Sequence, residues 1–420
     1  MRNYRSIIVP AGNWWFRIAW LVFAFVCFQS TFLEPSMVLI PGQRANVFAG
    51  LFCALALVAA LIAARDCRVP WNRFEVGMCL LLGILAVAGT VVSVDPLSAG
   101  LRVFVLFSSG LGGFWCARIL LSDPAGQDRF QWLCLGLLAG AVIWGLVGYV
   151  TLGRPSYIFR AHEHPVNTVL LLLWVAPLGM IARGGRLGWW LGLSALGASF
   201  LVICLSTKMA AMWIPLVAAG IGAALKIQRG GRIALLSVAV VGIALALTIH
   251  FVPVHYWAKS SSVWFRAENY PFCLHIVKKH PFLGIGLCEP RKQYLEDYQI
   301  RYPGISTQQF SEMLDTNRTP ENIFLTFATD LGIPFVLLYV LSLAYLLREL
   351  FRSLQKKPPE SFMNPLVILV PILAGLLYFQ VYDGLMYPQV NWFFHVLLGM
   401  IPMTYAGEGS VDEARGTISS

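Results

Sequence analysis

Residues 45–64 read ANVFAGLFCALALVAALIAA, a run of 20 residues that contains no charged side chain. A helix that crosses the hydrocarbon core of a bilayer needs about 20 mostly apolar residues. Similar runs recur along the chain, in which hydrophobic residues make up 58% and charged residues 12%. A typical soluble domain carries roughly 25% charged residues. The sequence therefore predicts a polytopic membrane protein.

Backbone N–H and C=O groups in lipid must be hydrogen-bonded within the protein, so we expect the spans to be helices. An all-α fold with about 12 transmembrane helices is predicted from the apolar runs of spanning length. The expected spans are residues 14–33, 45–64, 74–94, 100–121, 131–151, 166–183, 187–206, 209–226, 232–252, 321–347, 363–382 and 386–406.

One polar stretch interrupts this pattern, between Val252 and Pro320. We therefore expect helices one to nine in residues 1–252, a loop domain with amphipathic helices in 253–320, helices ten to twelve in 321–407 and a disordered tail in 408–420. A helical bundle needs no such insertion in order to fold. The loop domain suggests chemistry at the membrane surface, on a substrate with a lipid tail and a charged or sugar head group.

The net charge of +10 has a topological explanation. Basic residues gather in alternate loops, for example Arg118 with Arg129, and such loops face the cytoplasm by the positive-inside rule. An even number of spans then places both termini in the cytoplasm and the loop domain outside. No nucleic-acid motif occurs, and the first apolar run lacks a clear cleavage site, so we interpret it as an anchor.

Cations in the short outer turns do not follow this charge rule. Lys208 lies after span seven in LSTKMAA (205–211), between apolar helices and without a nearby carboxylate. An unpaired cation at such a position is costly and is by default a functional candidate. The alternative is that the side chain snorkels to the outer head groups. For Arg160 the two interpretations are balanced, and for Arg44 and Arg102 snorkelling is favoured.

A histidine cluster precedes span six, in the sequence RAHEHPVN (160–167). His162 and His164 flank a glutamate at an outer membrane edge, where imidazoles can exchange protons near neutral pH. The same residues suit a solvated loop that ends where a helix starts after Pro165. Both interpretations stay open.

The loop domain contains an expected helix and a turn. Residues 262–279 place apolar side chains at a spacing that suits a helix on the membrane surface, which Pro271 is expected to break or begin. The following HPFLGIG (280–286) predicts a turn, because glycines permit tight backbone conformations. A disulfide between Cys273 and Cys288 is possible in an oxidising compartment. No Cys/His spacing is typical of a zinc site.

Several short motifs follow one another from span seven to span ten: STKMAA (206–211), Arg266 at the start of the amphipathic helix, HPFLGIG (280–286), ENIFL (321–325) and DLGI (330–333). Their order, with the twelve-span layout and the single large outer loop, resembles the O-antigen ligase and polymerase family of bacterial envelope glycosyltransferases. That family usually has arginine where this chain has Lys208, and histidine where it has Glu321. Lysine keeps the charge but loses the planar fork that grips phosphate oxygens, and glutamate is a weaker base than histidine.

The resemblance implies an enzyme of the bacterial inner membrane that transfers a glycan from undecaprenyl pyrophosphate to a sugar hydroxyl at the outer face. The acceptor is lipid A–core in ligases and another lipid-linked repeat unit in polymerases. Cations must neutralise the departing diphosphate, and the candidates are Lys208 and Arg266, with Arg160 third. No acidic cluster is arranged for a metal ion, so we predict a metal-independent enzyme without a cofactor.

The acceptor hydroxyl also needs a base. Glu321 is the first candidate, and His162, His164 and His280 follow. Glu321 has a second interpretation, because an acid in the first helical turn after Pro320 complements the helix dipole; one residue can do both.

Further candidates for substrate contact are Asn322, Asp383 of the turn YDG (382–384), Arg160, His162 and His164. The aromatic residues Tyr382, Tyr387 and Trp392 suit either sugar stacking or the interfacial aromatic belt, and we favour the belt.

Two alternatives remain beside a ligase. A polymerase that extends O-antigen or exopolysaccharide chains shares the same motifs, and the missing histidine weakens the preference for a ligase. A secondary transporter is less favoured, because such proteins show internal repeats and charged groups in mid-span. Here the outer cations lie at span ends, and the two halves show no repeat.

Overall fold

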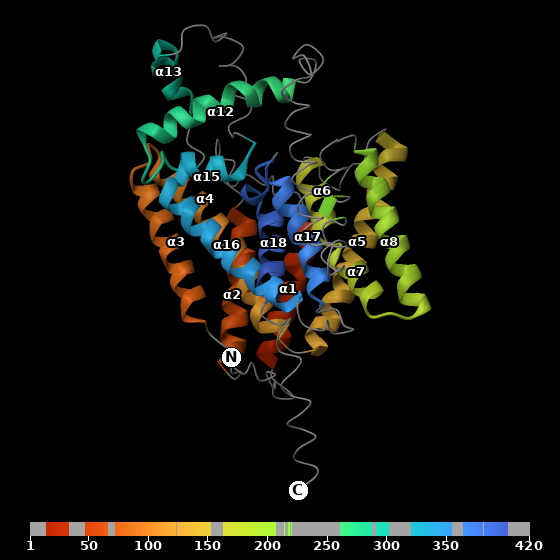
Figure 1. Ribbon diagram of the computed structural model, residues 1–420. Helices are drawn as coiled ribbons and strands as arrows, with labels where there is room; N and C mark the ends of the chain where they lie inside the picture. The colour runs from red at the N-terminus through yellow and green to blue at the C-terminus, as the bar shows by residue number, and fades with distance from the viewer. Residues whose placement is uncertain are drawn as a thin grey trace.

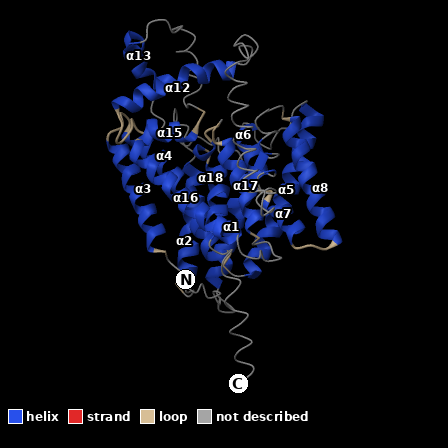
Figure 2. Cartoon of the chain, viewed as in Figure 1, coloured by secondary structure: helices blue, strands red, loops and turns tan. Residues whose placement is uncertain are grey.

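The computed structural model describes residues 14–32, 47–65, 72–122, 124–152, 163–206, 261–287, 291–301, 321–354, 364–380 and 382–401, with isolated positions between 214 and 220. Every regular element in these ranges is a helix (Figure 2). Eight helical segments among the described residues are long and apolar enough to cross a membrane, and one of them, Pro165–Ala182, consists of two short helices. The prediction of an all-α, multi-pass membrane protein is confirmed. The full number of spans is not tested, because the expected spans 209–226 and 232–252 lie almost wholly outside the described residues.

The helices before the loop domain follow the predicted spans, except that span six consists of two short helices joined by a turn at Leu173 and Trp174. Their bounds are α1 Trp14–Phe32, α2 Val47–Ala64, α3 Arg73–Val91, α4 Pro96–Leu120, α5 Pro124–Leu152, α6 Glu163–Leu172, α7 Val175–Ala182 and α8 Arg186–Leu205. The later elements are α12 Ser261–Lys279, η1 Arg291–Tyr294, α13 Leu295–Arg301, α15 Ile323–Leu331, α16 Ile333–Leu354, α17 Pro365–Tyr378, η2 Gly384–Met386 and α18 Pro388–Met400.

Helix α4 packs against α2, α3 and α18. Glycine allows a close approach to α18, because a Cβ on Gly113 would lie 2.5 Å from the carbonyl oxygen of Trp392. Small residues have this role in membrane bundles, where close packing drives helix association. Trp392 itself is fully buried and donates a hydrogen bond from Nε1 to Cys27 Sγ at 3.4 Å. The interpretation of Trp392 as a residue of the interfacial belt is therefore wrong.

The predicted span 321–347 is not one helix. Gly332 has a φ of +88° and ends α15, and α16 starts at the next residue and runs on to Leu354. This conformation is readily adopted by glycine and rarely by residues with a Cβ. As a result, α15 is a separate short helix that lies at one end of the bundle beneath α12 (Figure 1).

Helix α12 lies across this end of the bundle, which we call the α12 end (Figure 1). The helix runs unbroken through Pro271, so the expectation that this proline would break or begin it is wrong. The proline lacks the N–H that would bond four residues back. The helix persists because Phe272 and Ile276, which follow the proline, are fully buried in a small core with Tyr298 of α13.

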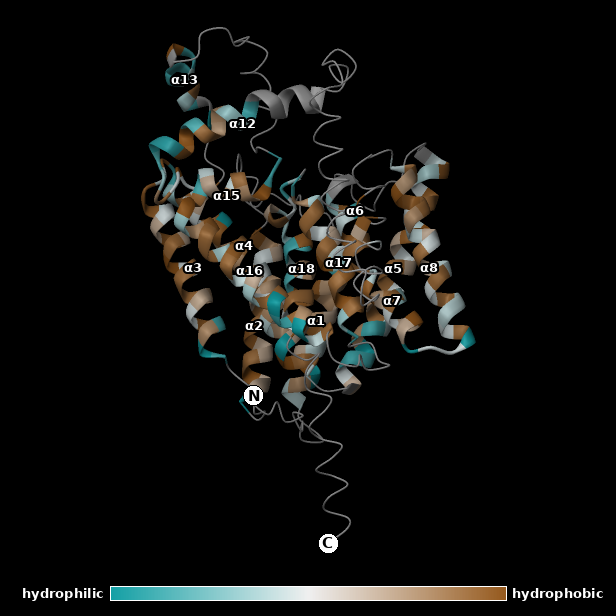
Figure 3. Cartoon of the chain, viewed as in Figure 1, coloured by the Kyte–Doolittle hydropathy of each residue, from teal (hydrophilic) through white to brown (hydrophobic). Residues whose placement is uncertain are grey.

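Apolar residues predominate on the bundle helices, and hydrophilic residues are more frequent on α12 and α13 (Figure 3). This distribution agrees with a bundle in lipid that carries a more polar segment at one end. That the α12 end faces the outside of the membrane, with both chain termini in the cytoplasm, stays a prediction.

Candidate functional site at the start of helix α15

Asn322 caps the N-terminus of α15. Its backbone is extended, with φ −147° and ψ 116°, and its Oδ1 accepts hydrogen bonds from the N–H groups of Phe324 and Leu325, both at 3.1 Å. Asparagine is favoured here because its side chain satisfies N–H groups that have no partner within the helix. The Asn322 Nδ2 also donates to the carbonyl oxygen of Gln380 at 3.3 Å. Asn322 thus starts α15 and joins it to the end of α17.

Glu321, the residue before the cap, has a left-handed backbone. Its φ is +54°, and it is the only non-glycine residue with a positive φ in the described ranges. A residue with a Cβ loses roughly 1–2 kcal/mol in this conformation, so neighbouring contacts must hold it there. Because Asn322 is the N-cap, Glu321 lies outside the helix and not in its first turn. The interpretation of Glu321 as a first-turn residue is therefore wrong.

Asp383 makes the contact that holds Glu321. Its Oδ2 accepts a hydrogen bond from the Glu321 N–H at 2.9 Å, and its Oδ1 accepts one from the Thr326 hydroxyl at 2.6 Å. Asp383 is only 2% exposed, and it directly precedes η2, between α17 and α18. One buried carboxylate therefore joins the strained residue, the first turns of α15 and the α17–α18 connection.

The turn 280–286 fits against the other end of α15. Three backbone hydrogen bonds of 2.8–3.0 Å join them, from Ile285 N–H to the Thr329 oxygen, from Gly286 N–H to the Asp330 oxygen and from Ile333 N–H to the Pro281 oxygen. Gly284 has a φ of +66° and Gly286 a φ of +101°. The predicted turn is confirmed, and its partner is the DLGI motif.

A second group of ionisable residues joins α12 to α13. Lys279 Nζ lies 2.5 Å and His275 Nε2 lies 2.6 Å from the same oxygen, Asp297 Oδ2. Hydrogen bonds from Lys279 and then His275 hold the pKa of the Asp297 carboxyl below its usual range. The neighbouring His280 ring packs on Tyr294, with 5.4 Å between ring centroids. Partial burial, and then the charge of Lys279, lower the pKa of His280, which favours its neutral form.

The structure brings together three of the residues proposed from the sequence: Glu321, Asn322 and Asp383. His164 lies on α6 and Arg266 on α12, and the side chains of both are outside the described part of the chain. Lys208, Arg160 and His162 lie entirely outside the described residues. Their roles stay predictions.

Two residues of the site were missed from the sequence. Thr326 lies four residues after Asn322, and this spacing puts both on one face of a helix. A polar pair at that spacing at the start of an apolar helix is a signal that could have identified Thr326. Gln380 contacts Asn322 from a separate segment, and no local pattern marks it.

The predictions on a metal ion and on a disulfide concern residues that the described ranges include only in part. No group of three or more His, Cys, Asp or Glu side chains there is placed to hold a metal ion. Metal independence stays a prediction. Cys273 is a free and fully buried thiol, and Cys288 lies outside the described residues.

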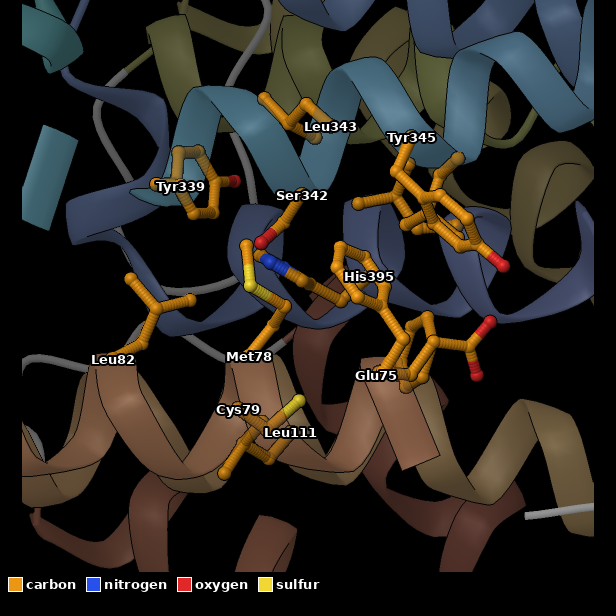
Figure 4. A pocket seen from close by; sticks show the side chains of 14 residues that line it. Glu75, Met78, Cys79, Leu82, Leu111, Tyr339, Ser342, Leu343, Tyr345 and His395 are labelled. Carbon is orange, nitrogen blue, oxygen red and sulfur yellow. The ribbon is translucent and has the colours of Figure 1, made fainter. Parts of the chain in front are cut away.

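A largely apolar pocket lies between α3, α4, α16 and α18, and none of the proposed site residues lines it (Figure 4). Its polar groups include Glu75 and His395. Glu75 forms a buried ion pair with Arg118, which lies in the last turn of α4 and not in a loop as expected. His395 Nδ1 lies 2.9 Å from the carbonyl oxygen of Asn391. The pocket therefore belongs to the interior of the bundle and not to the site at α15.

Comparison with known proteins agrees with the motifs. No curated protein matches the chain. Residues 168–340 match a family model described as O-antigen ligase. This region runs from α6 into α16 and includes Glu321 and Asn322, whereas Asp383 lies beyond it. The resemblance to the O-antigen ligase and polymerase family is thereby confirmed, and residues 168–340 of this membrane protein carry the family's domain.

Proposed function

We propose that the protein is a ligase-type glycosyltransferase that moves a glycan from undecaprenyl pyrophosphate to a sugar hydroxyl of lipid A–core. In this proposal the α12 end of the bundle faces the periplasm. The observation that carries the proposal is the left-handed backbone of Glu321, held by the buried Asp383. Strained conformations of this kind cluster at functional sites, because they persist only where the surrounding structure fixes them.

The geometry supports a chemical role for the Glu321 side chain. Asn322 already caps α15, so the helix does not need the Glu321 carboxylate for its start. We assign that carboxylate as the base. The acceptor hydroxyl attacks the sugar carbon that bears the diphosphate, the bond between that carbon and the diphosphate oxygen breaks, and Glu321 takes the hydroxyl proton. General base catalysis of this kind contributes about 10²–10⁴ to a rate.

The departing diphosphate requires positive charge where its own negative charge grows. Arg266 is on α12, the helix that lies over the end of the bundle where α15 starts (Figure 1). Lys208 follows α8, and the turn between α7 and α8 lies at the opposite end of the bundle, so α8 ends toward the α12 end (Figure 1). We assign these two cations to the diphosphate, with Arg160 as a third.

The remaining candidates divide into two roles. Both oxygens of Asp383 accept hydrogen bonds from within the chain, which favours a positioning role over direct contact with the sugar. Asn322, Arg160, His162 and His164 are assigned to contacts with the substrate.

The test is transfer by the purified protein in lipid vesicles, supplied with undecaprenyl pyrophosphate-linked glycan and lipid A–core. Glu321→Gln removes the base at nearly constant size, and transfer should fall by about 100-fold or more. The matched control is Glu349→Gln, on α16, where Glu349 pairs with Arg352 at 2.7 Å. The control should transfer normally. Full transfer by Glu321→Gln would remove Glu321 from the mechanism.

Two further arms complete this experiment. Lys208→Ala and Arg266→Ala should each lower transfer by about 10²–10³, the usual loss for one group that stabilises developing charge. Leaving out lipid A–core separates a ligase from a polymerase, because a polymerase still lengthens the lipid-linked glycan. A requirement for added divalent cation would reject the metal-free mechanism.

A further inference from the structure

An ion pair inaccessible to water joins the loop domain to α15. Arg291, the first residue of η1, donates from Nη2 to Asp330 Oδ1 at 2.5 Å. Their side chains are 1% and 0% exposed. Moving two charges out of water is costly, and loss of one partner leaves the other charge buried without compensation. Docking of this part of the loop domain on α15 therefore depends on both residues.

The backbone around the pair permits little sliding of one segment along the other. A Cβ on Gly332 would lie 2.2 Å from the carbonyl oxygen of Phe282. A Cβ on Gly284 would lie 2.3 Å from the carbonyl carbon of Asp330. Because a Cβ does not lie this close to a backbone atom in real proteins, only glycine fits at these two positions. The ion pair and the interlocked glycines thus define one register between the turn 280–286 and α15.

Helix α12 takes part in the same junction through Cys273. This residue is fully buried, and its thiol lies near the side chains of Arg291, Asp330 and Thr329. Burial raises the pKa of the Cys273 thiol to about 12. Because the thiolate is the reactive form, Cys273 should be inert at neutral pH while α12 is docked.

The two ends of α15 are therefore held by two different buried carboxylates. Asp383 fixes the N-terminal end, next to Glu321, and Asp330 joins the C-terminal end to Arg291. The helix has only 9 residues, which corresponds to a length of about 13 Å. A helix this short transmits a displacement of one end to the other.

We propose that Arg291 and Asp330 are a positioning pair for glycan transfer, which fixes α12, the helix that carries Arg266, relative to Glu321 at the start of α15. This inference rests on the proposed function. Neither residue needs to touch the substrate. A misplacement of about 1 Å between reacting groups can lower a rate by about 10²-fold, so loss of the pair should reduce kcat.

The experiment compares Arg291→Met, Asp330→Leu and the double variant, in vesicles, by two readouts. The first is the rate at which a maleimide labels Cys273, measured by mass spectrometry of the digested protein. The second is glycan transfer. Each single variant buries an uncompensated charge, so labelling should rise by about 100-fold or more and kcat should fall by about 10–100-fold. The double variant buries no charge and should recover both.

Arg352→Met is the matched control, because Arg352 is 52% exposed in the last turn of α16. It should leave both readouts unchanged. Lost transfer with Cys273 still protected would overturn the proposal, and so would fast labelling with full transfer. A double variant that protects Cys273 but stays inactive would show that one residue takes part in the chemistry directly. If the wild type transfers no glycan, the proposed function fails and the positioning role with it, while the labelling rates still show whether the pair docks the loop domain.

Discussion

Replacement of Glu321 by glycine should stabilise the protein and abolish transfer at the same time. The left-handed conformation at φ +54° costs a residue with a Cβ roughly 1–2 kcal/mol, and glycine avoids this cost. The greater freedom of glycine in the unfolded chain offsets about 0.5–1 kcal/mol of the gain. The backbone N–H that Asp383 accepts is retained. A net stabilisation of about 0.5–1 kcal/mol follows.

The comparison that isolates this effect is Glu321→Gly against Glu321→Ala. Both variants lack the carboxylate, so both should lose transfer by about 10²-fold or more. They differ only in the Cβ, so alanine keeps the strain and glycine releases it. Unfolding of the two purified variants in the same detergent measures the difference. A glycine variant no more stable than the alanine variant would refute the assignment of strain, and an active glycine variant would refute the role of the side chain.

Four further predictions concern Asp383, Gly332, Gly77 of α3 and helix α13. Asp383→Asn should lower stability by about 1–3 kcal/mol and reduce transfer, because the amide puts an NH2 donor in place of one of the two oxygens that accept from the Glu321 N–H and the Thr326 hydroxyl. Unfolding and transfer of this variant and of a double variant with Thr326→Val should show losses that do not add. Gly332→Ala should destabilise the protein and speed labelling of Cys273, since its φ is +88° and its Cβ would lie 2.2 Å from a carbonyl oxygen. Gly77→Ala, with open space around its Cβ, should be neutral or should stabilise α3 by up to about 1 kcal/mol. The protection of α13 amides against hydrogen exchange, taken relative to the intrinsic exchange rate at each pH, should stay constant from about pH 8 to pH 5 and should fall below about pH 4, near the ordinary carboxyl value. The pKa of Asp297 is lowered by Lys279 and His275, so its contribution is present above its unfolded pKa and is lost as pH falls through the folded one. Protection that is lost already at pH 6 would point to another group.

The membrane fold could be predicted from the sequence because each span is a local property. An uncharged run such as residues 45–64 is long enough to cross a bilayer, and within lipid its backbone has to be helical. The break between α15 and α16 could not be predicted in this way. Apolar residues continue on both sides of Gly332, and a hydropathy average over a span does not register one change of φ.

The site was predictable only in part, for a related reason. The motif order identified Glu321 and Asn322 as candidate site residues, and the position of the turn YDG identified Asp383 as a third candidate. The contacts among these residues depend on segments far apart in the chain. Asp383 and Thr326 are 57 residues apart, and Arg291 and Asp330 are 39 residues apart. A single sequence shows that these residues are polar or charged, but it does not show which of them are in contact in the folded protein.

The contact between Asp383 and Glu321 also bears on how the protein is made. The glutamate is synthesised well before the carboxylate that contacts its backbone, because α15, α16 and α17 lie between the two along the chain. A nascent polypeptide that has inserted α15 and α16 therefore contains Glu321, the proposed base, but not the carboxylate that fixes its backbone. Under the proposed function, competence for transfer begins only when the last helices enter the membrane.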